Sequence, residues 1–189
     1  MMKLLLHSCC APCSVKCIDD LAAEDLRPAL FWYNPNIHPY TEYRSRRDTL
    51  VKFAADSGLE LIGDDEYGLR LFLHNMPAAE TQADDHPSRC AYCYRLRLEK
   101  TAVHAAKNGY DYFSTTLLIS PYQNHDLIRQ IGEELGEAQG VKFLYRDFRP
   151  LFREGQGRAR ELGLYLQKYC GCIFSEEERY LPKKARALP

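Results

Sequence analysis

Short apolar runs alternate along the chain with longer amphipathic segments. Short apolar runs bounded by polar or turn-forming residues are typical of buried strands, whereas apolar residues repeated every three or four positions indicate helices. The apolar runs predict strands over residues 3–7, 29–33, 59–62, 110–114 and 141–145. The amphipathic pattern predicts helices over residues 14–24, 41–57, 88–107, 124–135 and 157–167, and again after residue 175.

This alternation of strands and helices indicates βαβ units. We therefore expect an α/β protein with a mainly parallel sheet flanked by helices. A single domain is expected over residues 1–180, followed by a basic C-terminal tail over residues 181–189. Residues 63–86 are less regular and contain one short apolar segment from 69 to 73.

Local residue types predict several helix boundaries. Glu42 and Arg46 have the i,i+4 spacing of an ion pair on one helix face. Side chains that accept hydrogen bonds from free backbone amides favour helix starts, and glycine favours helix ends. By these rules the expected N-caps are Ser14, Thr41 and Asn124, and the glycines expected just beyond helix ends are Gly58 and Gly136.

Polar motifs directly follow four of the predicted strands. They are His-Ser-Cys-Cys at 7–10, Asn-Pro-Asn at 34–36, Ser-Thr-Thr at 114–116 and Asp-Phe-Arg at 147–149. Parallel sheets place ligands beyond the carboxyl ends of their strands, near the point where the strand order reverses. We therefore expect these motifs to meet at one edge of the sheet and to form the site.

Length and composition narrow the roles open to the eight cysteines. A chain of 189 residues can bury a sizeable core without disulfides. The apolar start of the chain is too short for a signal peptide, and no stretch approaches the roughly 20 apolar residues of a membrane span. We expect a cytoplasmic protein with no membrane partner, and structural disulfides are rare in that compartment.

Charge is distributed unevenly although the net charge is only −1. Residues 54–141 carry 7 basic and 14 acidic side chains, a net of −7. Residues 142–189 carry 11 basic and 6 acidic side chains, a net of +5. The basic C-terminal quarter makes nucleic acid one possible partner, although an ordinary solvated surface explains the charge equally well.

The cysteines fall into three clusters, at residues 9–17, 90–93 and 170–172. Two thiols in a C-x-x-C pair at the start of a helix share a face near its positive end, which favours thiolate. Thiolates are the soft ligands that zinc and iron–sulfur centres select, and spacing does not separate those two metals. Cys17, within a helix, is expected to be a small buried apolar residue. The candidate metal ligands are Cys9, Cys10, Cys13, Cys90, Cys93, Cys170 and Cys172.

Several ordered motifs resemble those of one enzyme family. They are HSCCAPC at 7–13, NPNI at 34–37, Glu-Tyr at 42–43, CxxCYxxR at 90–97, STTLL at 114–118, SPYQ at 120–123, DFR at 147–149 and YCGC at 169–172. The set resembles the cobalamin-independent epoxyqueuosine reductases of the QueH type, over residues 7–175. No motif position departs clearly from the pattern.

The resemblance implies a reaction and its cofactors. It implies reduction of the epoxide of epoxyqueuosine, at the wobble position of the tRNA anticodon loop, to the alkene of queuosine. This is the last step of queuosine formation, and it consumes two electrons and two protons and releases water. The implied cofactors are a [4Fe-4S] cluster and an additional nearby metal ion, expected to be iron. The implied fold is Rossmann-like, and the implied partners are tRNA and an external electron donor.

The motif positions also supply candidate site residues. Proton-transfer candidates in the post-strand loops are His7, Tyr122 and Asp147, each of which can instead simply order its loop. Candidate contacts to the nucleoside or the tRNA are Asn34, Asn36, Tyr43, Arg47, Arg97, Ser114, Thr115, Thr116, Gln123 and Arg149. Further phosphate contacts are sought among Arg44, Arg46, Arg153, Arg158 and Arg160. Stacking residues for an anticodon-loop base are sought among Trp32, Tyr33, Tyr40 and Tyr122.

Three other functions compete with this hypothesis. A tRNA-thiolating enzyme of the ATP-pyrophosphatase type would share the fold, but residues 9–13 lack the glycines that such a phosphate loop needs. A non-catalytic zinc-binding RNA module is compatible with the number of cysteines. A dithiol oxidoreductase using Cys90 and Cys93 is the third alternative.

Overall fold

The sheet consists of five parallel strands in a computed structural model that describes residues 2–63, 65–76 and 88–181. The strands are β1 (Leu4–His7), β2 (Ala29–Phe31), β3 (Leu61–Ile62), β4 (Tyr112–Thr115) and β5 (Lys142–Phe143). Their order is β3-β2-β1-β4-β5, and every described pairing is parallel. The expected α/β class with a mainly parallel sheet is therefore confirmed.

Strand β1 lies at the centre of the sheet and is buried along its whole length. Its leucines are buried on both faces of the sheet, which suits a continuous apolar run in a parallel sheet covered on both sides. In the register, His7 lies opposite Phe31 of β2 and Thr115 of β4. The polar residues that end β1 and β4 are thus side by side, at the switch point of the strand order.

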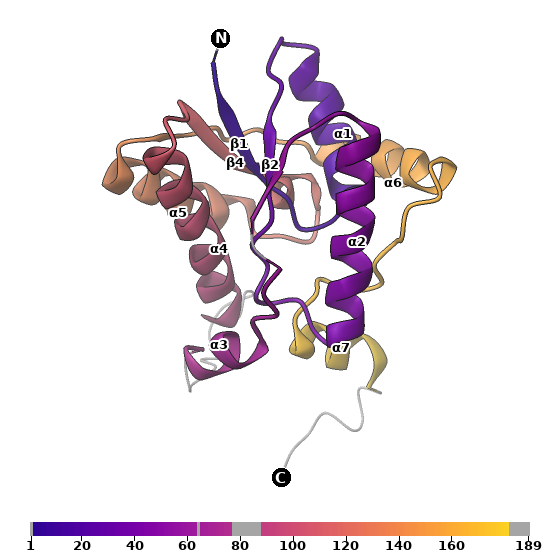
Figure 1. Cartoon of the computed structure of the whole chain (residues 1–189). Helices are drawn as coiled ribbons and strands as arrows, with labels where there is room; N and C mark the ends of the chain where they lie inside the picture. Colours follow the sequence, from indigo (N-terminus) through magenta and orange to yellow (C-terminus); the bar gives the residue numbers. More distant parts are fainter. Residues whose placement is uncertain (1, 64, 77–87, 182–189) are drawn as a thin grey trace.

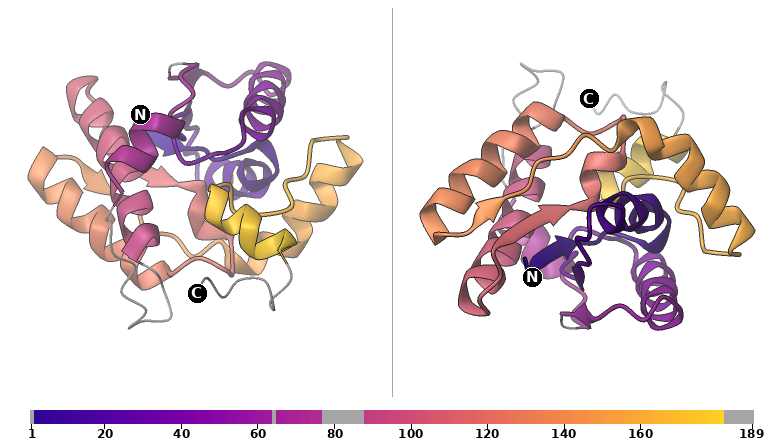
Figure 2. Two further views of the ribbon diagram at one scale, coloured as in Figure 1. Left: turned by 90° about the horizontal axis from the view of Figure 1, so that it is seen from below. Right: turned by 90° about the horizontal axis from the view of Figure 1, so that it is seen from above.

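Helices cover both faces of the sheet (Figure 1). Helices α1 (Ala11–Ala22), α2 (Tyr40–Asp56) and α6 (Phe152–Glu161) lie on one side of it, and α4 (Ser88–Lys107) and α5 (His125–Gln139) lie on the other. The shorter elements are α3 (Leu69–His74), α7 (Ile173–Tyr180) and the 3-10 helices η1 (Thr116–Ile119) and η2 (Arg149–Leu151). The view from below in Figure 2 shows α7 at the carboxyl end of the sheet, between the α4 side and the α6 side.

Two predicted N-caps were wrong. Helix α1 begins at Ala11, because Cys10 is extended and Pro12 is pre-set for a first helical turn. Ser14 lies inside this helix, and its hydroxyl donates to the Cys10 carbonyl at 2.8 Å. Helix α2 begins at Tyr40 after Pro39, so Thr41 is not its cap.

Other predicted helix boundaries were confirmed, with one exception. Asn124 caps α5 by accepting a hydrogen bond from the Leu127 amide, and Gly58 follows α2 with φ +62°. Gly136 does not end α5, because the helix continues to Gln139 and stops at Gly140, which has φ +68°. Gly136 instead permits close packing, since a Cβ there would lie 2.7 Å from the Val141 carbonyl oxygen.

The chain after α6 is a long loop rather than a helix. The predicted helix over residues 157–167 was shifted: α6 ends at Glu161, and Gly163 follows with φ +65°. The loop brings residues 169–172 back to the carboxyl edge of the sheet, where α7 begins. Residues 182–189 of the predicted basic tail, and much of the segment 63–86, lie outside the described residues. Among the described helices, none has the length and apolar character needed to cross a membrane.

Candidate thiol-lined active site

A cavity of about 400 Å³ opens at the carboxyl edge of the sheet. Its volume is within the range of small-molecule sites. It lies where β1 and β4 end, as the strand order predicts. The residues lining it are Cys9, Cys13, Arg46, Thr116, Leu117, Ser120, Tyr122, Gln123, Phe152, Gln156, Gln167, Lys168, Tyr169, Cys170, Ser175, Glu178 and Arg179.

Three thiols form a buried group at the junction of β1 and α1, and we call them the thiol triad: Cys9, Cys10 and Cys13. Their sulfur atoms all lie within 4.8 Å of one another, and the Cys9 and Cys10 sulfurs are 3.8 Å apart. Hydrogen bonds from the thiols of Cys10 and Cys13 hold the pKa of Cys9 well below its usual value. This arrangement favours thiolate at Cys9 over its two neighbours, and three close sulfurs are a donor set suited to a soft metal ion.

Four more thiols form a second group, the thiol quartet: Cys90, Cys93, Cys170 and Cys172. Burial, and then the neighbouring charge of Cys170, raise the pKa of Cys90 to about 11. Burial also raises the pKa of Cys93 to about 12, and the charges of Cys170 and Cys172 add to this effect. Members from opposite halves of the chain are therefore electrostatic neighbours. The raised pKa values keep these thiols protonated. A bound metal ion coordinates thiolates and would displace those protons.

Three helices direct their positive ends at these thiols. Cys10 is the N-cap of α1 and Cys13 lies in its first turn. Cys90 lies in the first turn of α4, as predicted, and Cys172 is the N-cap of α7. Partial positive charge at a helix N-terminus favours thiolates and other anions. Converging N-termini therefore create an electropositive environment where the sequence concentrates its sulfur.

A buried arginine anchors the segment that carries Cys170. Arg46 donates from Nη1 to the Cys170 carbonyl and from Nη2 to the Tyr169 carbonyl, each at 2.9 Å. Its Nε pairs with Glu42 at 2.7 Å, which confirms the predicted i,i+4 pair. Because Arg46 is buried and committed to these partners, the structure argues against its expected role as a phosphate contact.

The fit of this segment is tight at Gly171. A Cβ there would lie 3.2 Å from Arg46 Nη1 and 3.4 Å from Asn36 Nδ2, and the residue has φ +136°. The His38 amide donates to the Gly171 carbonyl at 2.7 Å. Only glycine suits this backbone conformation and this close approach.

A second buried arginine, Arg97, lies beneath the thiols. It is 1 % exposed, and its Nε donates to the Cys93 carbonyl at 3.1 Å. Its Nη2 has no hydrogen-bond partner. Burial alone would lower the pKa of Arg97, but the charges of Cys93, Cys170 and Cys9 raise it. We expected Arg97 to contact the substrate, but the structure places it in the interior.

His7 is fixed by two hydrogen bonds at the end of β1. Its Nε2 contacts the Tyr33 carbonyl at 3.2 Å, so this nitrogen is the donor, and its Nδ1 accepts from the Thr115 hydroxyl at 2.9 Å. Burial lowers the pKa of His7 to about 4. Thr116 Oγ1 accepts a hydrogen bond from the Cys9 amide at 3.3 Å. His7 does not line the cavity, so this geometry favours a role in ordering the loops beside the triad.

The other two proton-transfer candidates are on or near the surface. Tyr122 is 79 % exposed and lines the cavity, where its ring meets the Phe152 ring edge-to-face. Asp147 pairs with Arg149 at 2.6 Å and is absent from the cavity lining. That hydrogen bond lowers the pKa of Asp147 to about 2, so the carboxylate is ionised at neutral pH.

Several expected substrate contacts are structural in this geometry. Tyr43 is buried and hydrogen-bonds Asp65, which also pairs with Arg47. Asn34 donates to the Ser8 carbonyl at 3.0 Å, and Ser114 donates to the Leu144 carbonyl at 2.7 Å. Asn36 is buried behind Gly171. Of the ten expected contacts, those that line the cavity are Thr116 and Gln123.

Two glutamines each donate an amide to a sulfur atom, one in each thiol group. Gln123 Nε2 lies 3.6 Å from Cys170 Sγ, and Gln167 Nε2 lies 3.3 Å from Cys13 Sγ. The sequence interpretation included Gln123 but missed Gln167. Its nearness to the Cys-Gly-Cys motif was the one available signal, because its partner Cys13 lies 154 positions away.

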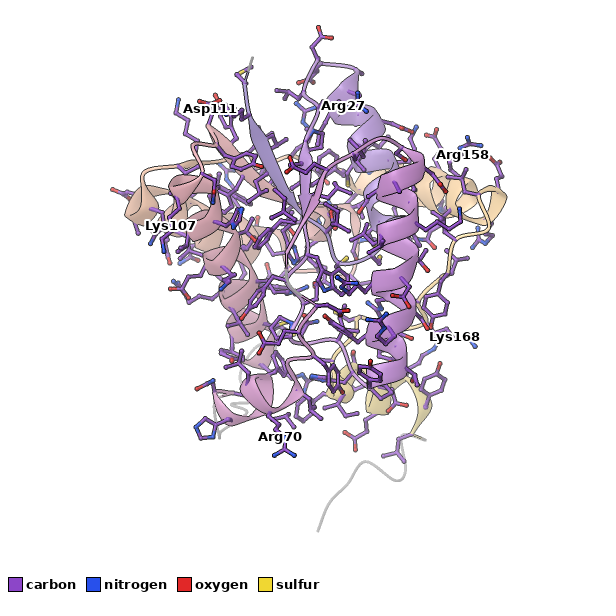
Figure 3. The ribbon with its side chains drawn as sticks, viewed as in Figure 1. Arg27, Arg70, Lys107, Asp111, Arg158 and Lys168 are labelled. Atoms are coloured by element: carbon purple, nitrogen blue, oxygen red, sulfur yellow. The ribbon has the colours of Figure 1, made fainter. Side chains whose placement is uncertain are left out.

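Cations and an aromatic residue surround the opening of the cavity. Lys168 and Arg179 line it together with Tyr122. In Figure 3, Lys168 projects outward from the loop between α6 and α7, whereas Arg158 lies higher on the molecule on α6. Arg158 pairs with Glu161 and does not line the cavity.

The donor set fits a thiolate-ligated metal centre. The three buried sulfurs of the triad lie within 4.8 Å of one another and could hold a soft metal ion or a cluster. The unpaired guanidinium nitrogen of Arg97 marks a place where the interior lacks negative charge. Thiolates bound to a metal would supply that charge.

Comparison with solved structures supports the fold. One similar chain is a predicted subunit of a tRNA methyltransferase from Methanocaldococcus jannaschii, with a TM-score of 0.50 and 14% identity. The match covers 85% of this chain and 76% of that one. At this identity the likeness shows only a shared Rossmann-like α/β fold.

Comparison with known sequences is more specific. A protein from Dehalococcoides mccartyi named epoxyqueuosine reductase QueH is 39% identical over 178 residues, covering 94% of both chains. A protein of the same name from Thermotoga maritima is 38% identical over 183 residues, covering 95% of this chain and 93% of that one. The family model described as epoxyqueuosine reductase QueH matches residues 4–178. The chain therefore belongs to the QueH family of epoxyqueuosine reductases, which are oxidoreductases.

Proposed function

We propose that the thiol-lined cavity is the active site at which this chain reduces epoxyqueuosine in tRNA to queuosine. The main supporting observation is that thiols of both groups, Cys9, Cys13 and Cys170, line one cavity at the switch point of the strand order, beside the buried triad. Reduction of the epoxide takes two electrons and two protons, breaks both ring C–O bonds and releases water. An external donor must supply the electrons.

The quartet has the number of thiols that a four-iron cluster uses, so Cys90, Cys93, Cys170 and Cys172 would hold it. Cys9, Cys10 and Cys13 would hold the additional metal ion, for which iron is the proposal. When bound, these groups supply single electrons and a Lewis acid that weakens a C–O bond. The chain's own part is to bind the nucleoside and keep its epoxide beside the thiols.

The lining of the cavity suits a polar, partly apolar nucleoside. Gln123, Gln167 and Thr116 place amide and hydroxyl groups next to the sulfurs. Leu117 and Phe152 add apolar wall on which a ring can pack. A small ligand is held in one orientation when its hydroxyl groups form hydrogen bonds with the protein and its rings pack against apolar side chains.

The opening suits an anticodon loop with its wobble nucleoside turned into the cavity. Lys168 and Arg179 provide positive charge for phosphates, and the exposed ring of Tyr122 provides a surface on which a neighbouring base can stack. Tyr40, another exposed stacking candidate, is absent from the cavity lining. Tyr122 is therefore the proposed stacking residue.

Replacing Tyr122 separates stacking from proton donation. Tyr122→Phe keeps the ring and should leave tRNA affinity and turnover near wild type. Tyr122→Leu should weaken tRNA binding by roughly ten- to a hundredfold, because base stacking contributes about 1–3 kcal/mol. Tyr40→Leu is the matched control. Loss of turnover in Tyr122→Phe with binding retained would make the hydroxyl the proton donor, and wild-type binding in Tyr122→Leu would refute the stacking role.

The function itself is tested on anaerobically purified protein. Iron, sulfide and zinc per chain are measured together with visible and EPR spectra, and epoxyqueuosine-containing tRNA is then supplied with a chemical reductant. Brown protein with about four sulfides and four or more irons per chain, converting the nucleoside to queuosine, supports the proposal. Colourless protein that holds only zinc after anaerobic reconstitution would refute the proposed function and favour the zinc-binding RNA module. Consumption of ATP with tRNA would favour the thiolation alternative.

A further inference from the structure

Two buried arginines flank the thiol groups, and they differ in their counter-charges. Arg46 is paired with the carboxylate of Glu42. Arg97 is equally buried, but none of the carboxylates in the described part of the chain forms an ion pair with it. A buried charge without a partner is costly, so such a group is retained where something compensates it.

The contacts of Arg97 show which groups can balance its positive charge. Its Nε is held by the Cys93 carbonyl, one helical turn back on α4. Its Nη2 lies in the interior without a hydrogen-bond acceptor. The Tyr94 ring lies 6.0 Å from the guanidinium carbon and adds no net charge. The acidic groups that interact with it most strongly are the thiols of Cys93, Cys170 and Cys9.

We infer that Arg97 is the fixed counter-charge of the thiolate-bound metal centre and raises its reduction potential. A permanent positive charge in the interior stabilises the more negative, reduced state over the oxidised one. Guanidinium stays protonated in proteins, so this charge does not vary with pH. The inference rests on the proposed function, because it needs a redox-active centre in the thiol groups.

The test compares neutral and charged replacements of Arg97. Arg97→Met and Arg97→Gln remove the charge, and Arg97→Lys keeps it. Arg95→Gln is the matched control, because Arg95 lies on the same helix but is exposed and paired with Glu134. Redox titration followed by EPR gives the midpoint potential of each loaded protein. We expect a more negative potential in the neutral variants, one close to wild type in Arg97→Lys, and no change in Arg95→Gln.

Thermal melting of metal-free and loaded protein provides a second measurement. Arg97→Met should fold without metal, since it removes an uncompensated buried charge. Loading should then raise its Tm less than it raises the Tm of wild type or Arg97→Lys. Failure of both neutral variants to fold without metal would overturn the inference. A wild-type potential in a folded, loaded neutral variant would also overturn it, and so would an equal shift in Arg97→Lys.

These results distinguish the two proposals. If wild type carries an iron–sulfur centre and reduces the nucleoside but Arg97→Gln keeps the wild-type potential, the inference fails and the function stands. If wild type carries no redox-active metal, the function itself fails and the inference fails with it.

Discussion

Members of the thiol triad and of the thiol quartet line the same cavity, but the two groups are built in different ways. The triad comes from five consecutive positions, where β1 ends and α1 begins, and it is buried. The quartet joins the start of α4 to the loop before α7, and Cys170 is exposed. Local chain geometry therefore positions the triad, whereas the quartet depends on docking of the Cys-Gly-Cys segment against Asn36, His38 and Arg46.

This difference implies that the two groups can be disrupted separately. A change that releases the docked segment should empty the quartet and leave the triad able to bind metal. A change at the junction of β1 and α1 should do the reverse. Cys170 is also the most accessible of the seven thiols to an oxidant, because it alone among them is exposed.

The largest effects are expected from removing thiols of either group. The double variants Cys9→Ala with Cys10→Ala, and Cys170→Ala with Cys172→Ala, should each lose queuosine formation altogether. Each should lose only the metal of its own group, as measured by iron and sulfide per chain. Full metal content and activity in the Cys9 and Cys10 variant would refute the role of the triad.

Cys17 supplies the control for these variants. It is fully buried, and its sulfur donates to the Cys13 carbonyl at 3.2 Å, outside both groups. Cys17→Ala should keep its metal and its activity, and should lower the free energy of unfolding by about 1 kcal/mol through a small cavity. Loss of metal in this variant would show that Cys17 is a metal ligand together with the triad.

The next largest effect is expected at Arg46. Arg46→Gln releases the Tyr169 and Cys170 carbonyls and leaves the carboxylate of Glu42, only 7% exposed, without its partner. Breaking a buried ion pair costs about 3–5 kcal/mol, so urea unfolding should show a loss of that order. Metal should be lost from the quartet before the triad, as followed by EPR and iron content.

Two further variants separate the charge of Arg46 from its anchoring. Glu42→Gln combined with Arg46→Gln should recover stability, because no buried charge is left unpaired, but it should not restore the quartet. Arg44→Gln removes surface pairs with Asp48 and Asp65 and should change stability by only about 1 kcal/mol. Normal quartet occupancy in Arg46→Gln would show that the segment docks without its anchor.

Smaller effects are expected from the two glutamines. Gln167→Leu and Gln123→Leu each remove an amide hydrogen bond to one sulfur, in the triad and the quartet respectively. A hydrogen bond to a charged group contributes about 1.5–3 kcal/mol, so activity should fall by roughly ten- to a hundredfold. The EPR spectrum of Gln167→Leu should change only in the signal of the triad metal, and that of Gln123→Leu only in the signal of the quartet metal. Identical changes in both variants would mean that the two groups behave as a single centre.

The smallest effect is expected from Asp147→Asn. Because Arg149 depresses the pKa of Asp147 to about 2, the carboxylate is ionised at neutral pH and has no proton to donate. Activity should stay within about twofold of wild type, since the group lies outside the cavity lining. A large loss of turnover would show that Asp147 takes part in the reaction.

The same pair predicts a small pH effect on stability. A depressed carboxylate pKa contributes stability above the unfolded value near 4, and that contribution is lost as pH falls through about 2. Because the pair is largely exposed, the contribution should be below about 1 kcal/mol. Acid unfolding of wild type and Asp147→Asn should therefore nearly coincide.

The strand–helix pattern and the motifs after the strands were enough to predict the parallel sheet and the edge that bears the site. Apolar runs and helix periodicity are local signals, and parallel βαβ connections follow from them with little freedom. Boundaries were predicted less well, as Ser14 and Gly136 show. Helix α1 begins before Ser14 because Pro12 suits its first turn, whereas Gly136 lies inside α5 because it packs closely against Val141.

The sequence by itself determined the thiol inventory, the triad and the family motifs, because these lie within short stretches of chain. Only the tertiary structure decided that Cys170 and Cys172 come near enough to Cys93 to interact with it electrostatically, and that Gln167 reaches Cys13. It also placed Arg97 inside the protein, although its spacing alone was compatible with a tRNA contact. The reason is physical: spacing along a chain fixes neighbours within a helical turn or a strand end, whereas contacts between distant segments depend on how whole elements pack.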